Sequence, residues 1–167
     1  IYLYLTSMGI NMKSNKKNIV QIEPWINYQE AFQLLRVIKN NYLTENQLTK
    51  EFENKIKELT KSKYVISIAN GSLAIFAILK VLGIGPGDEV IVPDLTFIAT
   101  ANSVIMAGAK PVLCDIKREN FSIDPDKVLE LINSKTKAII PVHLYGLSAN
   151  ILELRDICRK NNLLLIE

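Results

Sequence analysis

From residue 64 onward, short continuous apolar runs alternate with segments of helical periodicity. These predict strands at 64–68, 89–92, 111–114, 137–142 and 163–166, and helices at 72–82, 97–107, 124–133 and 148–161. Apolar strands that alternate with helices at a spacing of about 25 residues are typical of a parallel sheet with helices on both faces. The sequence therefore predicts an α/β fold with a mainly parallel sheet. Ligands of such sheets bind at the edge formed by the carboxyl ends of the strands.

The first 63 residues show a different pattern. Helical spacing of apolar residues at 27–40 and 46–60 predicts two amphipathic helices, which we interpret as a helical arm over residues 18–63. Residues 1–17 are expected to be a disordered or non-native tail, because they combine a short apolar run with a basic cluster at 13–17.

Composition argues against several classes of protein. The chain has 167 residues, 49% of them apolar, which is enough for one domain with a core. With 20 basic and 17 acidic residues, the net charge of +3 gives no support for a nucleic acid or a membrane as partner. Cys114 and Cys158 lie in apolar patterns without metal-ligand spacing, so we expect no metal, two buried reduced thiols and a cytoplasmic protein.

One junction between a strand and a helix has the chemistry of an anion site. Asn70-Gly71-Ser72 ends the predicted strand 64–68 and begins the predicted helix 72–82. The first N–H groups of a helix have no acceptor inside it and lie at the positive end of its dipole. Gly71 and Ser72 are therefore candidates for binding a phosphate. The alternative is a simple turn with Ser72 near the helix cap.

A glycine-rich segment, Gly83-Ile84-Gly85-Pro86-Gly87, looks at first like a dinucleotide-binding motif. That motif follows a strand and opens a helix, whereas this segment follows a helix and precedes a strand. Pro86 also lacks the N–H that a phosphate would need. We therefore interpret the segment as a turn.

Three other side chains lie where predicted strands end. Phe97 could stack on a planar cofactor or could be an ordinary core aromatic. His143, the only histidine, is either a hydrogen-bonded structural residue or part of a site. Asp115 either caps a turn or faces the site, and we favour the turn.

Several motifs occur in a fixed order along the chain. They are Asn70-Gly71-Ser72-Leu73-Ala74, then 82–93, then 96–102, then 108–112 with Asp115, and finally 135–146, which contains His143-Leu144-Tyr145-Gly146. In this order and spacing they resemble the DegT/DnrJ/StrS-type sugar aminotransferases, and the resemblance covers about residues 20–167.

The resemblance implies a fold-type I enzyme that depends on pyridoxal 5'-phosphate (PLP). Such enzymes transfer an amino group, commonly from glutamate, to a nucleotide-linked keto-sugar, and they work as homodimers. Our most specific expectation is a perosamine synthase-like enzyme of polysaccharide or glycoside biosynthesis, which aminates carbon 4 of a GDP-linked deoxysugar.

The family motifs also suggest roles for individual residues. Gly71 and Ser72 match the turn that holds the cofactor phosphate, and Phe97 matches the aromatic residue that stacks on the cofactor ring. His143 lies in a motif near the pocket and is a candidate substrate-binding residue. Tyr42-Leu43-Thr44 matches the arm motif near the substrate entrance, but Glu45-Asn46-Gln47 follows where the family usually has Gly-Pro.

The resemblance also implies two catalytic residues that are not among these 167. The family's aspartate for the pyridine nitrogen comes directly after a strand ending like Leu165-Ile166-Glu167, and its Schiff-base lysine lies further on. We therefore expect an N-terminal fragment that is inactive by itself, with residues 64–167 forming an incomplete large domain. The alternatives are a PLP-dependent sugar dehydratase of the same fold and a non-catalytic binding or regulatory module.

Overall fold

The computed structural model describes residues 24–39 and 47–167. The predicted tail at 1–17 and the arm motif Tyr42-Leu43-Thr44 lie outside these residues. The chain divides between Val65 and Ile66 into two units, which are described separately.

The N-terminal unit contains two helices, α1 (Tyr28–Lys39) and α2 (Gln47–Thr60), where the amphipathic patterns predict them. Asn27 begins α1: its side chain accepts a hydrogen bond from the N–H of Gln29 at 2.7 Å, and the Glu30 carboxylate accepts one from the N–H of Asn27 at 2.8 Å. This reciprocal arrangement satisfies N–H groups that a helix start leaves without partners.

The C-terminal unit is built on a parallel sheet, as the alternating pattern predicts. Its strands are β1 (Glu89–Pro93), β2 (Lys110–Cys114), β3 (Thr136–Ile139) and β4 (Leu164–Leu165), and their order is β2-β1-β3-β4. All three neighbouring pairs are parallel. All five residues of β1, an inner strand, are buried. Continuous burial explains why this strand is apolar on both faces.

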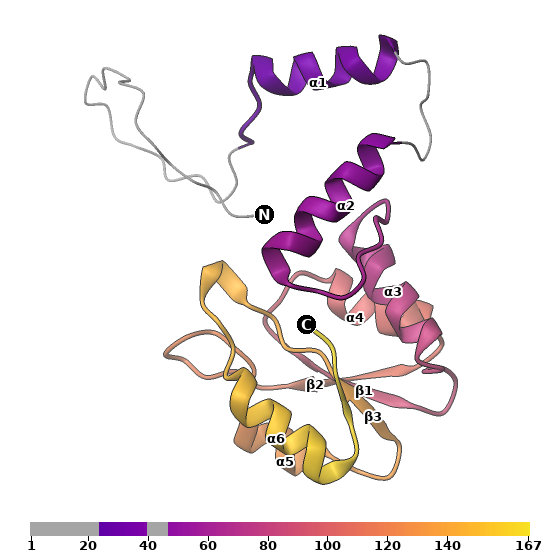
Figure 1. The fold of residues 1–167 in the computed structure, drawn as a ribbon. Helices are drawn as coiled ribbons and strands as arrows, with labels where there is room; N and C mark the ends of the chain where they lie inside the picture. Colours follow the sequence, from indigo (N-terminus) through magenta and orange to yellow (C-terminus); the bar gives the residue numbers. More distant parts are fainter. Residues whose placement is uncertain (1–23, 40–46) are drawn as a thin grey trace, which may run out of the picture. The chain divides into compact units, whose positions relative to one another are not determined.

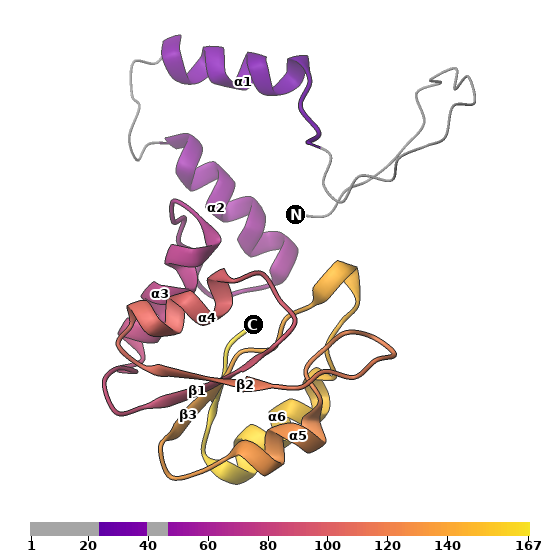
Figure 2. The ribbon, with the colours of Figure 1, turned by 180° about the vertical axis from the view of Figure 1, so that it is seen from behind.

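Helices cover both faces of the sheet, as Figures 1 and 2 show. They are α3 (Gly71–Val81), α4 (Ala99–Met106), α5 (Pro125–Leu131) and α6 (Ile151–Asn161), with a short 3-10 turn, η1 (Leu144–Gly146), before α6. Helices α3 and α4 pack on the face that carries Val90 and Val92. Helices α5 and α6 pack on the opposite face, which carries Ile91. Alternate residues of β1 therefore belong to two separate cores.

The turns at the amino edge of the sheet are specified by local hydrogen bonds. The Asp88 side chain accepts from the N–H of Gly85 at 3.0 Å, and the Gly85 carbonyl accepts from the N–H of Asp88 at 3.1 Å. The glycine-rich segment is therefore a turn, as predicted. Gly108, which ends the α4 region, has a φ of +89°, and a Cβ there would lie 3.2 Å from Pro86. Glycine is the residue that tolerates this conformation.

Several predicted elements end up to three residues away from their observed ends, as in the strand predicted at 137–142, which ends at Ile139. Two differences have a clear physical reason. Residues 64–68 are extended but form no strand, and Tyr64 and Ile66 are 76% and 80% exposed. An apolar run becomes a strand only when its N–H and C=O groups pair with a neighbour, and no strand among the described residues pairs with this segment. The last helix begins at Ile151 rather than at Ser148, whose hydroxyl bonds to the carbonyl of Ala149 instead of capping the helix.

Candidate functional site

The junction Asn70-Gly71-Ser72 forms a capped helix start with an open first turn. The Asn70 side chain accepts a hydrogen bond from the N–H of Leu73 at 3.0 Å and serves as the N-cap of α3. Helix geometry leaves the N–H groups of Gly71 and Ser72 without acceptors inside the helix. A Cβ added at Gly71 would meet no atom within 4 Å. This turn therefore has both the N–H groups and the space that a bound anion requires.

Phe97 lies just before α4, which packs beside α3 on the same face of the sheet. Its ring is not part of either core, because the residue is 74% exposed. Its carbonyl accepts the N–H of Thr100 at 3.1 Å, and the hydroxyls of Thr96 and Thr100 lie 3.2 Å apart. These contacts fix the backbone on both sides of an exposed phenyl ring. The interpretation of Phe97 as a core aromatic is therefore wrong.

His143 follows β3 and lies beside Glu167, which follows the neighbouring strand β4. Its Nε2 is 3.4 Å from a carboxylate oxygen of Glu167. Its Nδ1 accepts a hydrogen bond from the backbone N–H of Ala149 at 3.1 Å. Because Nδ1 is an acceptor, the neutral ring carries its proton on Nε2, which faces the carboxylate. These two contacts hold the ring of His143 at the carboxyl edge of the sheet, and its role in binding substrate stays a prediction.

Asp115 stabilises a turn after β2, as favoured from the sequence. Its side chain accepts from the N–H of Ile116 at 2.8 Å, and its carbonyl accepts from the N–H of Asp124 at 3.0 Å. Asp124 caps α5 through the N–H of Asp126. This turn leads the chain from the carboxyl edge of β2 into the helix on the other face.

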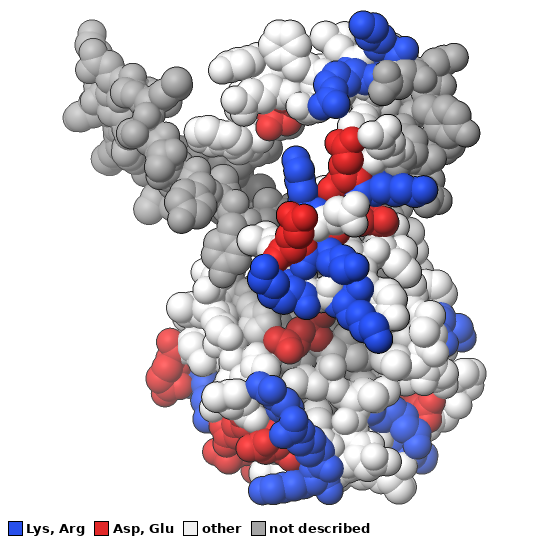
Figure 3. Space-filling model, in the orientation of Figure 1, with Lys and Arg blue, Asp and Glu red and all other residues white. Residues whose placement is uncertain are grey.

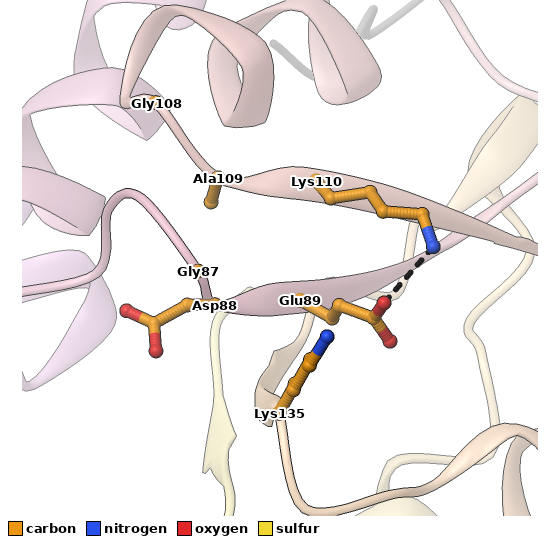
Figure 4. A pocket seen from close by; sticks show the side chains of 7 residues that line it. All are labelled: Gly87, Asp88, Glu89, Gly108, Ala109, Lys110 and Lys135. Carbon is orange, nitrogen blue, oxygen red and sulfur yellow. Dashed lines mark hydrogen bonds and ion pairs between the residues drawn. The ribbon is translucent and has the colours of Figure 1, made fainter.

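A second polar cluster lies at the opposite, amino edge of the sheet and was not expected from the sequence (Figure 4). Glu89 is only 8% exposed. Its carboxylate accepts hydrogen bonds from Asn133 at 2.8 Å and from Lys110 at 2.9 Å, beside a pocket of about 260 Å³. Lys135 points toward the same carboxylate. The only sequence signal was a charged residue at the first position of an otherwise apolar strand.

These contacts make the stability of the protein depend on pH. The hydrogen bonds from Asn133 and Lys110, together with nearby lysine charges, hold the pKa of Glu89 below its usual value. The ionised form therefore stabilises the fold above the unfolded pKa of about 4.3, and this contribution is lost as the pH falls through the lower folded value. We expect the Glu89→Gln variant to lose less stability than the wild type over this acidic range. Urea midpoints measured against pH test this, and parallel curves would contradict it.

The two cysteines are buried free thiols, as predicted. Burial raises the pKa of Cys114 to about 12 and that of Cys158 to about 11. Because the thiolate is the reactive form, we expect both to react with iodoacetamide at least about 100-fold more slowly than a free cysteine. Labelling followed by mass spectrometry, with and without urea, measures this. Rapid labelling of the folded protein would show that the expectation is wrong.

Three further findings concern the metal-ligand groups, the helices and the charges of the described residues. No group of three or more His, Cys, Asp or Glu side chains in residues 24–39 and 47–167 could hold a metal ion. Within the same residues, no helix is both long and apolar enough to cross a bilayer. On the face drawn in Figure 3, basic and acidic side chains are interspersed rather than gathered into a patch of one sign.

Comparison with known proteins identifies the family of this chain. Residues 25–167 match the model of the DegT/DnrJ/EryC1/StrS aminotransferase family. The chain belongs to this family. The resemblance noted from the motifs is thus confirmed.

Individual relatives of this aminotransferase family member are similar over most of its length. Over 117 residues it is 47% identical to the GDP-perosamine synthase of Caulobacter vibrioides, a match that covers 70% of this chain and 32% of that protein. Over 162 residues it is 40% identical to a pleiotropic regulatory protein of Geobacillus stearothermophilus. This match covers 96% of this chain and 42% of that protein. These matches therefore span about a third to two fifths of the length of the two relatives.

A solved structure confirms the predicted fold class. The crystal structure of NtdA from Bacillus subtilis with bound cofactor PMP superimposes with a TM-score of 0.81 at 34% identity. The match covers 92% of this chain and 38% of that one. The parallel sheet and its helices therefore correspond to part of the fold of that aminotransferase family structure.

Proposed function

We propose that this family member is the N-terminal part of a PLP-dependent aminotransferase that converts a nucleotide-linked keto-deoxysugar to an amino sugar. The observation that carries the proposal is the open first turn of α3. The Asn70 side chain accepts the N–H of Leu73, and the N–H groups of Gly71 and Ser72 remain for an anion. The chain is also similar to a protein whose structure was solved with PMP. PMP is the aminated form of PLP, and both carry a phosphate.

The described residues fit this cofactor at two points. The first turn of α3, with the Ser72 hydroxyl, would hold the phosphate, and the exposed ring of Phe97 would stack on the pyridine ring. When bound, the cofactor supplies an electron sink for the transfer of the amino group. We propose that the lysine that binds it and the aspartate at its ring nitrogen follow residue 167, so that residues 1–167 alone would not catalyse the reaction.

The relatives support the proposed substrate class. The 47% identity to a GDP-perosamine synthase supports a GDP-linked sugar as the acceptor. We propose that this sugar is a keto-deoxysugar and that glutamate is the amino donor. His143 would lie on the substrate side of the site, held by Ala149 and Glu167. The complete enzyme would act as a homodimer in the cytoplasm, where its two buried thiols would remain reduced.

The test uses the full-length protein, purified with PLP. Glutamate should change the ultraviolet–visible spectrum of the bound cofactor, and the aminated enzyme should then convert the GDP-linked keto-sugar to an amino sugar detectable by mass spectrometry. A dehydratase of the same fold would instead release water from the sugar without consuming glutamate. That result would overturn the proposal of amino transfer and retain the cofactor.

A second candidate function is regulatory. It is favoured by the similarity to the Geobacillus stearothermophilus regulatory protein over 96% of this chain. A regulatory protein of this fold would bind the cofactor or the nucleotide sugar without turnover. Binding without any amino transfer over a range of nucleotide sugars would therefore favour this alternative.

A further inference from the structure

Helix α4 contains a fully buried hydroxyl that contacts the candidate phosphate site. Ser103 is 0% exposed. Its Oγ lies 2.9 Å from the carbonyl oxygen of Ser72, in the first turn of α3, and 2.7 Å from the carbonyl oxygen of Ala99. Both partners are acceptors, so the single hydroxyl proton of Ser103 is shared between them.

The contact with Ser72 is not needed to satisfy the hydroxyl. A serine inside a helix can donate to the carbonyl four residues earlier, which here is that of Ala99. Alanine would also favour the helix more strongly than serine and would bury no polar group. What the serine adds is a bond to a residue 31 positions earlier, on a different helix.

We propose that Ser103 is a positioning residue that fixes the first turn of α3 for recognition of a phosphate group. The inference rests on the proposed function. The bond holds the backbone of Ser72 against α4, and it therefore sets where the N–H groups of Gly71 and Ser72 lie. Because Phe97 lies just before α4, the same bond links the phosphate-binding turn to the helix that follows the stacking ring.

The experiment compares two ligands that differ only in the phosphate. The full-length protein is stripped of cofactor, and its dissociation constants for PLP and for pyridoxal are measured by fluorescence titration. In Ser103→Ala we expect the affinity for PLP to fall by about fivefold, the effect of one hydrogen bond, and the affinity for pyridoxal to stay at the wild-type value. Inorganic phosphate should also compete less well with PLP in the variant.

A matched control and a second variant complete the design. Ser122 is another buried serine, 2% exposed, whose hydroxyl bonds to Asn120 at 2.8 Å in the turn before α5. Ser122→Ala should leave both affinities unchanged. Ser103→Cys keeps the approximate side-chain volume but has a weaker hydrogen-bond donor, so it should also lower the affinity for PLP and not that for pyridoxal. If Ser103→Ala does not fold, the affinities of Ser103→Cys test the positioning role.

Three outcomes have distinct meanings. Unchanged affinity for PLP in the Ser103 variants would overturn the positioning role. An equal loss for PLP and pyridoxal would also overturn it, because a general loosening of the fold does not discriminate by phosphate. Failure of the wild-type full-length protein to bind PLP would instead overturn the proposed function on which the inference rests.

Discussion

Phe97→Ala in the full-length protein is expected to lower the affinity for PLP by about tenfold. A stacked aromatic pair contributes about 0.5–1.5 kcal/mol beyond the area that it buries, and 1.4 kcal/mol corresponds to a factor of ten. The ring is 74% exposed in the described residues and belongs to neither of their two cores, so its removal creates no cavity in those cores. Equilibrium dialysis of the cofactor and a thermal unfolding curve of the cofactor-free protein measure the two effects separately.

The conservative variant Phe97→Tyr serves as the control, because it keeps a flat ring at the same position. It should retain most of the affinity. In contrast to the Ser103 variants, Phe97→Ala should weaken pyridoxal and PLP alike, since the ring would contact the pyridine and not the phosphate. Wild-type affinity for both ligands in Phe97→Ala would eliminate the stacking role.

Leu79→Ala is expected to destabilise the protein by about 2–5 kcal/mol, the usual range for a buried leucine. Leu79 is 0% exposed and is the only buried residue of α3. It packs in the core between the sheet and the helices α3 and α4, together with Val90 and Val104. Its loss leaves a cavity that the other side chains of this core would have to fill. Urea unfolding measures the change.

Val81 provides a matched control on the same helix. It is 87% exposed, so Val81→Ala should change the free energy of unfolding by no more than about 0.5 kcal/mol. Equal changes in the free energy of unfolding for the two variants would mean that the packing of Leu79 does not stabilise the contact between α3 and the sheet.

The buried strands were predictable because a strand that is covered on both faces needs apolar residues at successive positions. All five residues of β1 are buried, in agreement with its mainly apolar sequence. Residues 64–68 carry a similar apolar signal, yet they form no strand among the described residues. Periodicity reports which residues avoid water but not whether a neighbouring strand is available to accept their hydrogen bonds.

The candidate site was predictable where a short motif sets it. Asn70-Gly71-Ser72 indicated a helix start with free N–H groups, and Asn70 caps that helix as the motif requires. The proximity of His143 and Glu167 follows from parallel strands ending at one edge. The bond from Ala149 to His143 depends on the path of η1, and the bond from Ser103 to Ser72 depends on how two helices pack. Neither long-range contact leaves a signal in the local sequence.

The alternation of β1 has a consequence for how this protein can change in evolution. Because Val90 and Val92 belong to one core and Ile91 to the other, one inserted or deleted residue would move every following side chain of the strand into the wrong core. Both helical layers would lose their partners at once. Length variation among descendants of this chain should therefore avoid 89–93 and concentrate in the surface turn at 116–121, where Lys117, Arg118 and Glu119 contribute to neither core.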